Sequence, residues 1–243
     1  MTQLLLAFLS VVAMPTLARA QCSASPPSHV QEALEETRKF MMSCSTAQIG
    51  DDKHILINDY SGQSMPPKMY VFTKTGNCIR EMEITWGVGQ SGSGTANGKP
   101  AACSEKSTQQ TPPGYHITAK HAGGERYNEN NSIGLAALSG QKSLGDRGIL
   151  IHGAEQPGTA SSWGCTGVPN DKFDDLKKLV GYGSLVNNYF GKPANINCGN
   201  KAGGDDKCEP EEAARNAASG KSTPSSGGGS TPSSRPSSAP NAR

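Results

Sequence analysis

Apolar positions recur every three or four residues between positions 28 and 41, which is the spacing of one face of an α-helix. Ser28 and Gln31 resemble a capping box at the start of this helix, and His29 is expected on its solvated surface. We therefore predict an amphipathic helix that packs on the core through Val30, Ala33, Leu34, Thr37, Phe40 and Met41.

The period changes to two from His54 onward, where Ile55 and Ile57 alternate with Leu56 and Asn58. This succession predicts a β-meander. Further strand-like segments, bounded by turn residues, are residues 69–73, 82–86, 115–119 and 184–190.

A second helix is predicted after Asn170, whose side chain can cap the first turn, and Gly181 ends it. Its apolar face is formed by Phe173, Leu176, Leu179 and Val180.

Two connections are rich in glycine and polar residues. Residues 87–98 follow a strand but lack the helix and the lysine of a phosphate-binding loop, so we interpret them as a surface loop. Residues 121–146 form a long connection of the kind that often serves as a lid or binding loop. His116, His121 and Tyr127 are therefore either pocket-lining residues or surface residues.

The two ends of the chain differ from its middle. An apolar run followed by small residues predicts a signal peptide over residues 1–20, with an uncleaved anchor as the alternative. We assign residues 21–50 to a helical segment packed on the main domain, 51–208 to that domain, and 209–243 to a disordered tail rich in Ser, Pro and Gly. We expect export to the periplasm, cell wall or extracellular space, with no membrane span after cleavage.

Charge and cysteine content narrow the function. A net charge of +2, without a basic cluster that interleaves with aromatics, gives no indication of nucleic-acid binding. The chain has seven cysteines, so one thiol is left over if the other six pair in an oxidising compartment. The simplest pairings are local, and other connectivities stay open: Cys22 with Cys44, Cys78 with Cys103, and Cys198 with Cys208.

The candidate chemistry lies within residues 149–170. An apolar run predicts a buried strand that ends in His152, and Cys165, the cysteine that we expect to stay unpaired, lies in a Gly-Cys-Thr-Gly turn. An imidazole that takes the proton of a thiol creates a nucleophile suited to acyl transfer. Gly164 lets backbone N–H groups converge on an oxyanion, and the Gly153 carbonyl is a candidate to hold the histidine tautomer.

Other interpretations of these two residues are structural. A cysteine is often a small buried apolar residue or half of a disulfide, and a histidine is often an ordinary surface or core residue. A zinc site would need two more ligands at suitable spacing, and none is near in the sequence. We expect neither a metal nor an organic cofactor.

The His152-Gly153 pair, followed by Ser162-Trp163-Gly164-Cys165, resembles the His-Gly and Ser/Thr-x-Gly-Cys motifs of the L,D-transpeptidases of bacterial peptidoglycan, also called YkuD-like domains. Residues 147–149 resemble a divergent branch of that family. Residues 111–115 resemble its Thr-Pro-x-Gly-x-Tyr/Phe segment, which adds Tyr115 to the candidate site. The resemblance implies a mainly β catalytic domain, a β-sandwich or barrel-like fold with a few peripheral helices, that acts on peptidoglycan stem peptides.

The chain departs from the family pattern around the cysteine. The common pattern has a second histidine before the Gly-Cys pair and an arginine after it, whereas this chain has Trp163 and Thr166. Arg147, or a lysine within residues 121–146, is the candidate substitute for the contact with the substrate carboxylate. Trp163 is a candidate apolar wall beside the acyl group, and Ser162 and Thr166 complete the candidate substrate-binding set.

The resemblance implies a two-step reaction. Cys165 attacks the carbonyl before the terminal D-alanine of a tetrapeptide stem, D-alanine leaves, and an amine accepts the acyl group. The alternatives are an L,D-carboxypeptidase or other murein hydrolase with the same site, and a non-catalytic, disulfide-stabilised wall-binding module. We expect a monomer.

Overall fold

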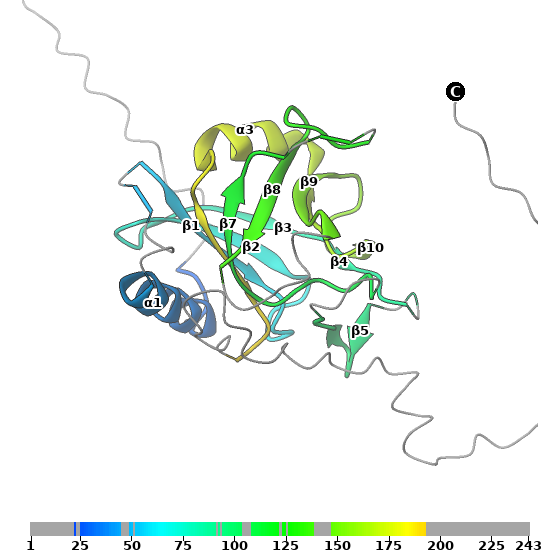
Figure 1. The fold of residues 1–243 in the computed structure, drawn as a ribbon. Helices are drawn as coiled ribbons and strands as arrows, with labels where there is room; N and C mark the ends of the chain where they lie inside the picture. The colour runs from blue at the N-terminus through cyan, green and yellow to red at the C-terminus, as the bar shows by residue number, and fades with distance from the viewer. Residues whose placement is uncertain are drawn as a thin grey trace, which may run out of the picture.

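An eight-stranded sheet in the order β11-β9-β8-β7-β12-β1-β2-β3 is the centre of the fold (Figure 1). Its strands, in chain order, are β1 His54–Asp59, β2 Lys68–Thr73, β3 Cys78–Glu83, β7 Gly114–Ala119, β8 Ser132–Ala137, β9 Leu150–Ala154, β11 Thr166–Pro169 and β12 Leu185–Tyr189. Two small sheets pair β4 Trp86–Gly87 with β10 Ala160–Ser162, and β5 Thr95–Ala96 with β6 Lys99–Pro100.

The computed structural model describes residues 22, 25–44, 49–50, 52–90, 92, 94–103, 108–121, 123–124, 126–138 and 147–192. The predicted signal peptide, the predicted tail and the predicted Cys198–Cys208 pair lie outside the described residues. Within them, neither helix has the length and apolar character that a membrane crossing requires.

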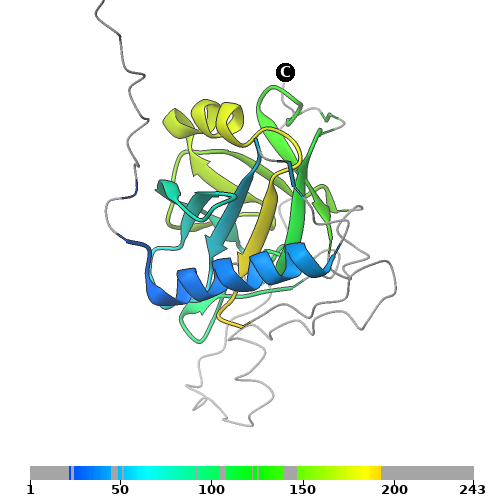
Figure 2. The ribbon, with the colours of Figure 1, turned by 90° about the vertical axis from the view of Figure 1, so that its left-hand side faces the viewer.

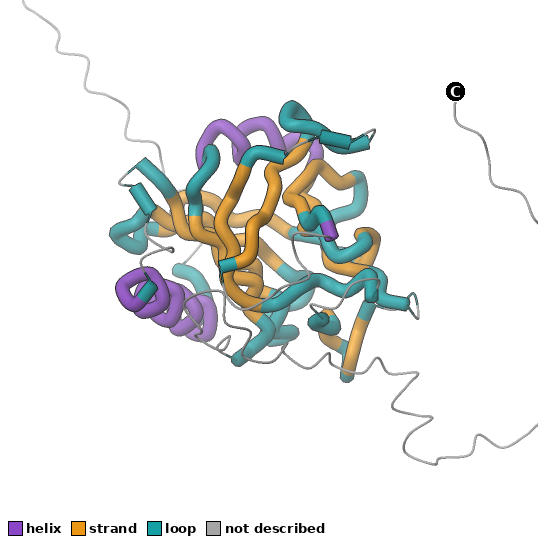
Figure 3. The backbone as a smooth tube through the Cα atoms, in the orientation of Figure 1, coloured by secondary structure: helices purple, strands orange, loops and turns teal. Residues whose placement is uncertain are grey.

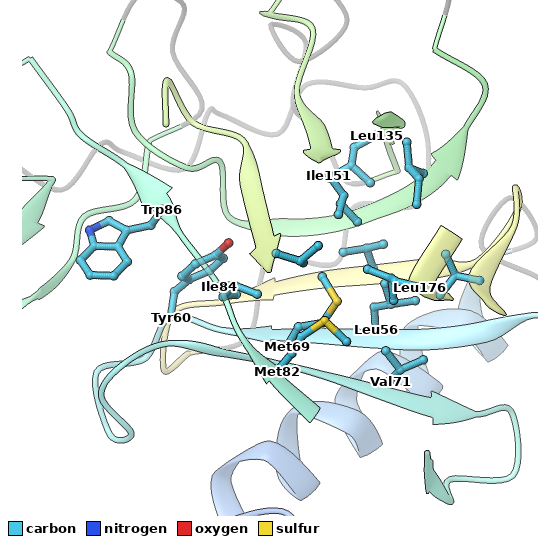
Figure 4. Close-up of a cluster of buried hydrophobic side chains, with 14 of the residues drawn as sticks. Leu56, Tyr60, Met69, Val71, Met82, Ile84, Trp86, Leu135, Ile151 and Leu176 are labelled. Atoms are coloured by element: carbon cyan, nitrogen blue, oxygen red, sulfur yellow. The ribbon is translucent and has the colours of Figure 1, made fainter. Parts of the chain in front are cut away.

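The large sheet curls until its two edges meet. Thr85, which follows β3 at one edge, exchanges two hydrogen bonds of 2.8 Å with Gly167 of β11 at the other edge. The interior holds a cluster of apolar side chains in which Leu135 and Ile151 face Leu56 and Met69 (Figure 4). This arrangement confirms the predicted mainly β, barrel-like fold, with strands at the centre and loops and helices around them (Figure 3).

Central strands of the sheet are buried on both faces. Along β1, Leu56 points into the interior cluster, whereas Ile55 and Ile57 belong to a second cluster on the outer face. Because successive side chains of a strand point to opposite faces, an almost continuous apolar run fits this position. The predicted alternation is therefore confirmed, but both faces are covered by protein.

The outer face is covered by α1, Ser28–Ser43, which lies across the strands (Figure 2). Its apolar side chains pack on the sheet, and Phe40 stacks on Tyr115 with ring centroids 3.9 Å apart. The predicted amphipathic helix is confirmed. The predicted capping box is wrong, because Ser28 is already helical, Pro27 occupies the cap position, and no side chain caps the first turn.

His29 is also corrected, since it is buried rather than solvated. Its Nε2 atom lies 2.7 Å from Oδ2 of Asp59, a residue with no exposed surface at the end of β1. The other carboxylate oxygen, Oδ1, accepts hydrogen bonds from the hydroxyl (2.6 Å) and the backbone N–H (3.1 Å) of Ser61. This polar cluster fixes the start of α1 to the sheet.

The helix α3, Asn170–Val180, covers the interior side through Phe173, Leu176 and Val180. Gly181 ends it, as predicted. The predicted capping role of Asn170 is wrong, because this residue is already helical and its side chain makes no capping hydrogen bond.

Strand order is only partly as predicted. Strands β1, β2 and β3 do form an antiparallel meander, but β3 covers Cys78–Glu83 rather than residues 82–86. The last strand, β12, pairs in parallel with β1 and antiparallel with β7, so it joins the two halves of the sheet.

Two of the predicted local disulfide pairings, Cys22 with Cys44 and Cys78 with Cys103, are wrong. Cys22 is bonded to Cys78, which connects the segment before α1 to β3. Cys44 and Cys103 are disulfide-bonded as well, whereas Cys165 is a free, partly exposed cysteine. The predicted unpaired thiol is thereby confirmed.

Candidate active site

His152 is presented by β9, next to β11. Leu150 and His152 line a pocket, whereas Ile151 between them points into the interior cluster, as strand alternation requires. In the parallel pairing of the two strands, Gly167 is the register partner of His152, and Cys165 immediately precedes β11. His152 and Cys165 both line this pocket, so two neighbouring strands present the imidazole and the thiol to the same space.

The backbone fixes the tautomer of His152. Its Nδ1 atom lies 2.7 Å from the carbonyl oxygen of Gly153. Because a carbonyl only accepts, Nδ1 carries the proton in the neutral ring, and Nε2 keeps a lone pair for use as a base. This is the contact predicted for Gly153. Burial lowers the pKa of His152, an effect that the Gly153 hydrogen bond partly opposes and the charge of Arg126 reinforces.

Cys165 depends on a glycine before it. Gly164 has a φ of +103°, a conformation that side chains rarely adopt. A β-carbon at this position would lie 2.6 Å from Nη2 of Arg147 and 2.7 Å from the carbonyl oxygen of Gln110. The turn that presents the sulfur therefore requires glycine both for its backbone angle and for its close contacts.

Arg147 packs against this turn and is hydrogen-bonded to two backbone carbonyls. Its Nη1 donates to the Cys103 carbonyl at 2.8 Å, and its Nη2 donates to the Gln110 carbonyl at 2.6 Å. The guanidinium is thereby fixed close to the sulfur. Burial raises the pKa of Cys165, while a backbone hydrogen bond from Leu150 and the positive charge of Arg147 lower it.

The pKa shifts of Cys165 and His152 act in the same sense. A raised thiol pKa and a lowered imidazole pKa both favour the uncharged forms over a thiolate–imidazolium pair. His152 is therefore suited to act as a general base that removes the thiol proton as the sulfur attacks.

The hydroxyl of Ser162, a pocket-lining residue, is hydrogen-bonded within the cysteine turn. Its hydroxyl donates to the carbonyl of Cys165 at 2.6 Å and accepts from the N–H of Gly164 at 3.3 Å. The N–H of Gly164 is thus already engaged. The N–H of Cys165 has no acceptor in the described part of the chain, which makes it the better candidate for an oxyanion donor.

The pocket around these residues has a volume of about 770 Å³. Trp163, which is 76% exposed, stands at its rim. The lining is mixed polar and apolar: Arg126, Tyr127, Arg147, Gly148, Leu150, His152, Gly153, Ala154, Glu155, Gln156, Ser161, Ser162, Trp163, Cys165 and Asn170.

Tyr127 and Arg126 come to the pocket from the segment before β8. The ring of Tyr127 lies 4.6 Å from that of His152, and the guanidinium of Arg126 lies 5.4 Å from the centroid of Tyr127. Tyr127 was a candidate from its place in the long connection. Arg126 was missed, because a single arginine in a polar segment carries no sequence signal that distinguishes it from a surface charge.

Several predicted residues point elsewhere. Thr166 has no exposed surface, and its hydroxyl lies 2.8 Å from that of Tyr60, on the side of the strand opposite Cys165. Tyr115 is buried against α1, and neither His116 nor His121 lines the pocket. The substrate-binding roles predicted for Thr166 and Tyr115 are corrected to structural ones.

Within the described ranges, no group of three or more His, Cys, Asp or Glu side chains is arranged to hold a metal ion.

No protein-family model and no curated protein matches the chain. Among solved structures, it is similar to an L,D-transpeptidase from Mycobacterium smegmatis (14% identity over 56% of this chain and 58% of that chain, TM-score 0.35). It is also similar to the catalytic domain of the E. faecium L,D-transpeptidase, with 16% identity over 57% of this chain and 98% of that chain and a TM-score of 0.34. A third similar structure is the helical cell shape determining protein Pgp2 from Campylobacter jejuni, with 16% identity over 70% of this chain and 58% of that chain and a TM-score of 0.38.

The chain thus spans less than two thirds of two of these three proteins. Identities and TM-scores this low carry no argument about activity.

Proposed function

We propose that the protein is an exported, cysteine-dependent L,D-transpeptidase that forms an acyl-enzyme on a tetrapeptide stem of peptidoglycan. The observation that carries the proposal is the pairing of a free Cys165 with His152 in one pocket, in a chain whose other described cysteines are disulfide-bonded. A thiol kept free in a disulfide-containing protein is what a nucleophile requires. The His-Gly and Ser-x-Gly-Cys motifs supply the substrate class.

In the first step, His152 Nε2 removes the thiol proton while the sulfur of Cys165 attacks the carbonyl that precedes D-alanine. A carbon–sulfur bond forms, and the carbonyl oxygen becomes an oxyanion that the Cys165 N–H stabilises. The imidazolium then gives its proton to the leaving nitrogen, the amide bond breaks, and D-alanine departs. The Gly153 carbonyl holds the ring in the required tautomer and stabilises its charged form.

In the second step, the amine of another stem attacks the thioester. His152 takes a proton from the attacking nitrogen, the carbon–sulfur bond breaks, and the thiol of Cys165 is restored by that proton. If water attacks instead, the same residues perform L,D-carboxypeptidase chemistry. The two outcomes differ only in the acceptor.

The test is a product analysis with purified muropeptides by mass spectrometry. Transfer predicts cross-linked dimers formed with loss of D-alanine, whereas hydrolysis predicts shortened monomers alone. Cys165→Ala is expected to abolish both products, with its folding verified by thermal unfolding. If the wild type gives no product but binds cell-wall sacculi as well as Cys165→Ala does, the protein is a binding module. The exposed Trp163 is the feature that favours that alternative.

A further inference from the structure

Three charged residues of the described chain line the pocket, namely Arg126, Arg147 and Glu155. Arg147 is committed to two backbone carbonyls beneath the cysteine turn. Arg126 is exposed, and it forms no ion pair with Glu155 or with any other acidic residue of the described segments. Its guanidinium therefore offers a full set of donors to an incoming group.

The backbone that carries Arg126 is well supported. The Asn131 side chain donates to the Arg126 carbonyl at 3.1 Å and accepts from the Asn128 N–H at 2.7 Å. Lys177 of α3 donates to the Asn130 carbonyl at 3.0 Å and also to the Glu129 carbonyl. The segment is thus tied both to itself and to a helix, so the position of Arg126 relative to the pocket is defined.

Arg126 lies one aromatic ring away from the base. Its guanidinium packs over Tyr127, and Tyr127 packs against His152. The residue that follows a scissile amide carries its carboxylate only one residue length from the reacting carbonyl, a span of about 3.3–3.6 Å. Arg126 lines the same pocket as His152 and Cys165, so the carboxylate of a donor bound there shares that pocket with the guanidinium.

We propose that Arg126 binds a free carboxylate on the residue that follows the scissile amide, so that the site selects acyl donors with a terminal carboxylate. The identity of the donor rests on the proposed function, but the carboxylate preference rests on the pocket alone. The arginine is a specificity-determining residue, and Tyr127 is the platform that orients it. Planar, charged Arg–carboxylate contacts are well suited to this selection.

The same geometry links binding to catalysis. The charge of Arg126 lowers the pKa of His152. A carboxylate bound at Arg126 offsets that charge, which raises the pKa and strengthens the base. A donor that lacks the carboxylate loses both the contact and this effect.

The test compares two alkylating reagents on the full chain. Iodoacetate carries a carboxylate and iodoacetamide does not, and both report on the thiol of Cys165. We expect Arg126→Gln to lower the ratio of their rate constants about threefold to fivefold, which is the upper part of the range for an exposed ion pair. Arg126→Lys is expected to keep most of the ratio, and high salt is expected to lower the wild-type ratio toward that of Arg126→Gln.

Lys39→Gln is the matched control, because it removes the same charge from an exposed position on α1, away from the pocket. Its ratio is expected to equal that of the wild type. An unchanged ratio in Arg126→Gln would overturn the proposal. An equal fall with both reagents would overturn it too, since that result means that the arginine only positions Tyr127 and His152.

A second arm uses stem peptides with a free or an amidated terminal carboxyl group. Wild type is expected to favour the free acid, and Arg126→Gln is expected to lose that preference. Equal turnover of both donors by the wild type refutes the carboxylate contact and leaves the proposed function standing. A reagent ratio that depends on Arg126, without turnover of either peptide, supports the contact and refutes the proposed function.

Discussion

Replacing Gly164 by alanine tests how the fold presents the nucleophile. The added β-carbon would meet Arg147 Nη2 at 2.6 Å and the Gln110 carbonyl at 2.7 Å, on a backbone with a φ of +103°. Gly123 is a matched control, because it has nearly the same φ, +101°, but nothing lies within 4 Å of its β-carbon position. The pair separates backbone strain from the close contact.

Strain from a disfavoured backbone angle costs about 1–3 kcal/mol in both variants. Only Gly164→Ala must also displace Arg147 from Gln110. Hydrogen bonds that involve a charged group contribute about 1.5–3 kcal/mol, so we expect Gly164→Ala to lose about 2 kcal/mol more stability than Gly123→Ala. For a domain of this size, that difference corresponds to a Tm lower by about 4–8 °C.

The measurements are thermal unfolding of both variants and the rate of Cys165 alkylation by iodoacetamide. Gly164→Ala is expected to lower both the Tm and the alkylation rate, whereas Gly123→Ala lowers the Tm modestly and leaves the rate unchanged. Equal losses of Tm in the two variants, with equal alkylation rates, would show that the contact of Gly164 with Arg147 has no energetic role.

Two further predictions concern charge and burial. Because burial raises the pKa of Cys165, its alkylation rate is expected to keep rising above neutral pH. Arg147→Gln removes a charge that lowers this pKa, so the pH–rate profile of alkylation is expected to move to higher pH. A shift of the profile to lower pH would contradict the effect assigned to Arg147. His29→Ala leaves the buried Asp59 carboxylate without its imidazole partner. We expect this variant to lower the free energy of unfolding, measured with urea, by about 1.5–3 kcal/mol and to leave the alkylation of Cys165 unchanged. A loss near zero would mean that the contact between His29 and Asp59 is energetically neutral.

Local patterns in the sequence predicted much of this structure. The strands around Ile55 and Leu185, the early helix and the pairing of His152 with the Gly153 carbonyl follow from periodicity and from adjacent residues. The odd number of cysteines predicted one free thiol, and the Gly-Cys-Thr-Gly turn singled out Cys165. These features depend on contacts between residues that are close along the chain, or on a simple count.

Features that depend on long-range packing were not predictable in this way. The contact of His29 with Asp59 joins residues 30 positions apart, and the periodicity of α1 placed that histidine on a solvated face. Likewise, the bond between Cys22 and Cys78 spans a sequence separation of 56 residues. Arg126 reaches the pocket only because the turn before β8 folds over His152, which no local pattern indicates.

The most direct test of the central claim is a single-turnover experiment with a tetrapeptide stem, followed by mass analysis of the peptide that contains Cys165. The proposed mechanism predicts a thioester on Cys165 whose added mass equals the stem without its D-alanine, together with one equivalent of released D-alanine. Cys165→Ala should give neither. Release of D-alanine by Cys165→Ala, or by wild-type protein whose thiol has been fully alkylated, would contradict the assignment of Cys165 as the nucleophile.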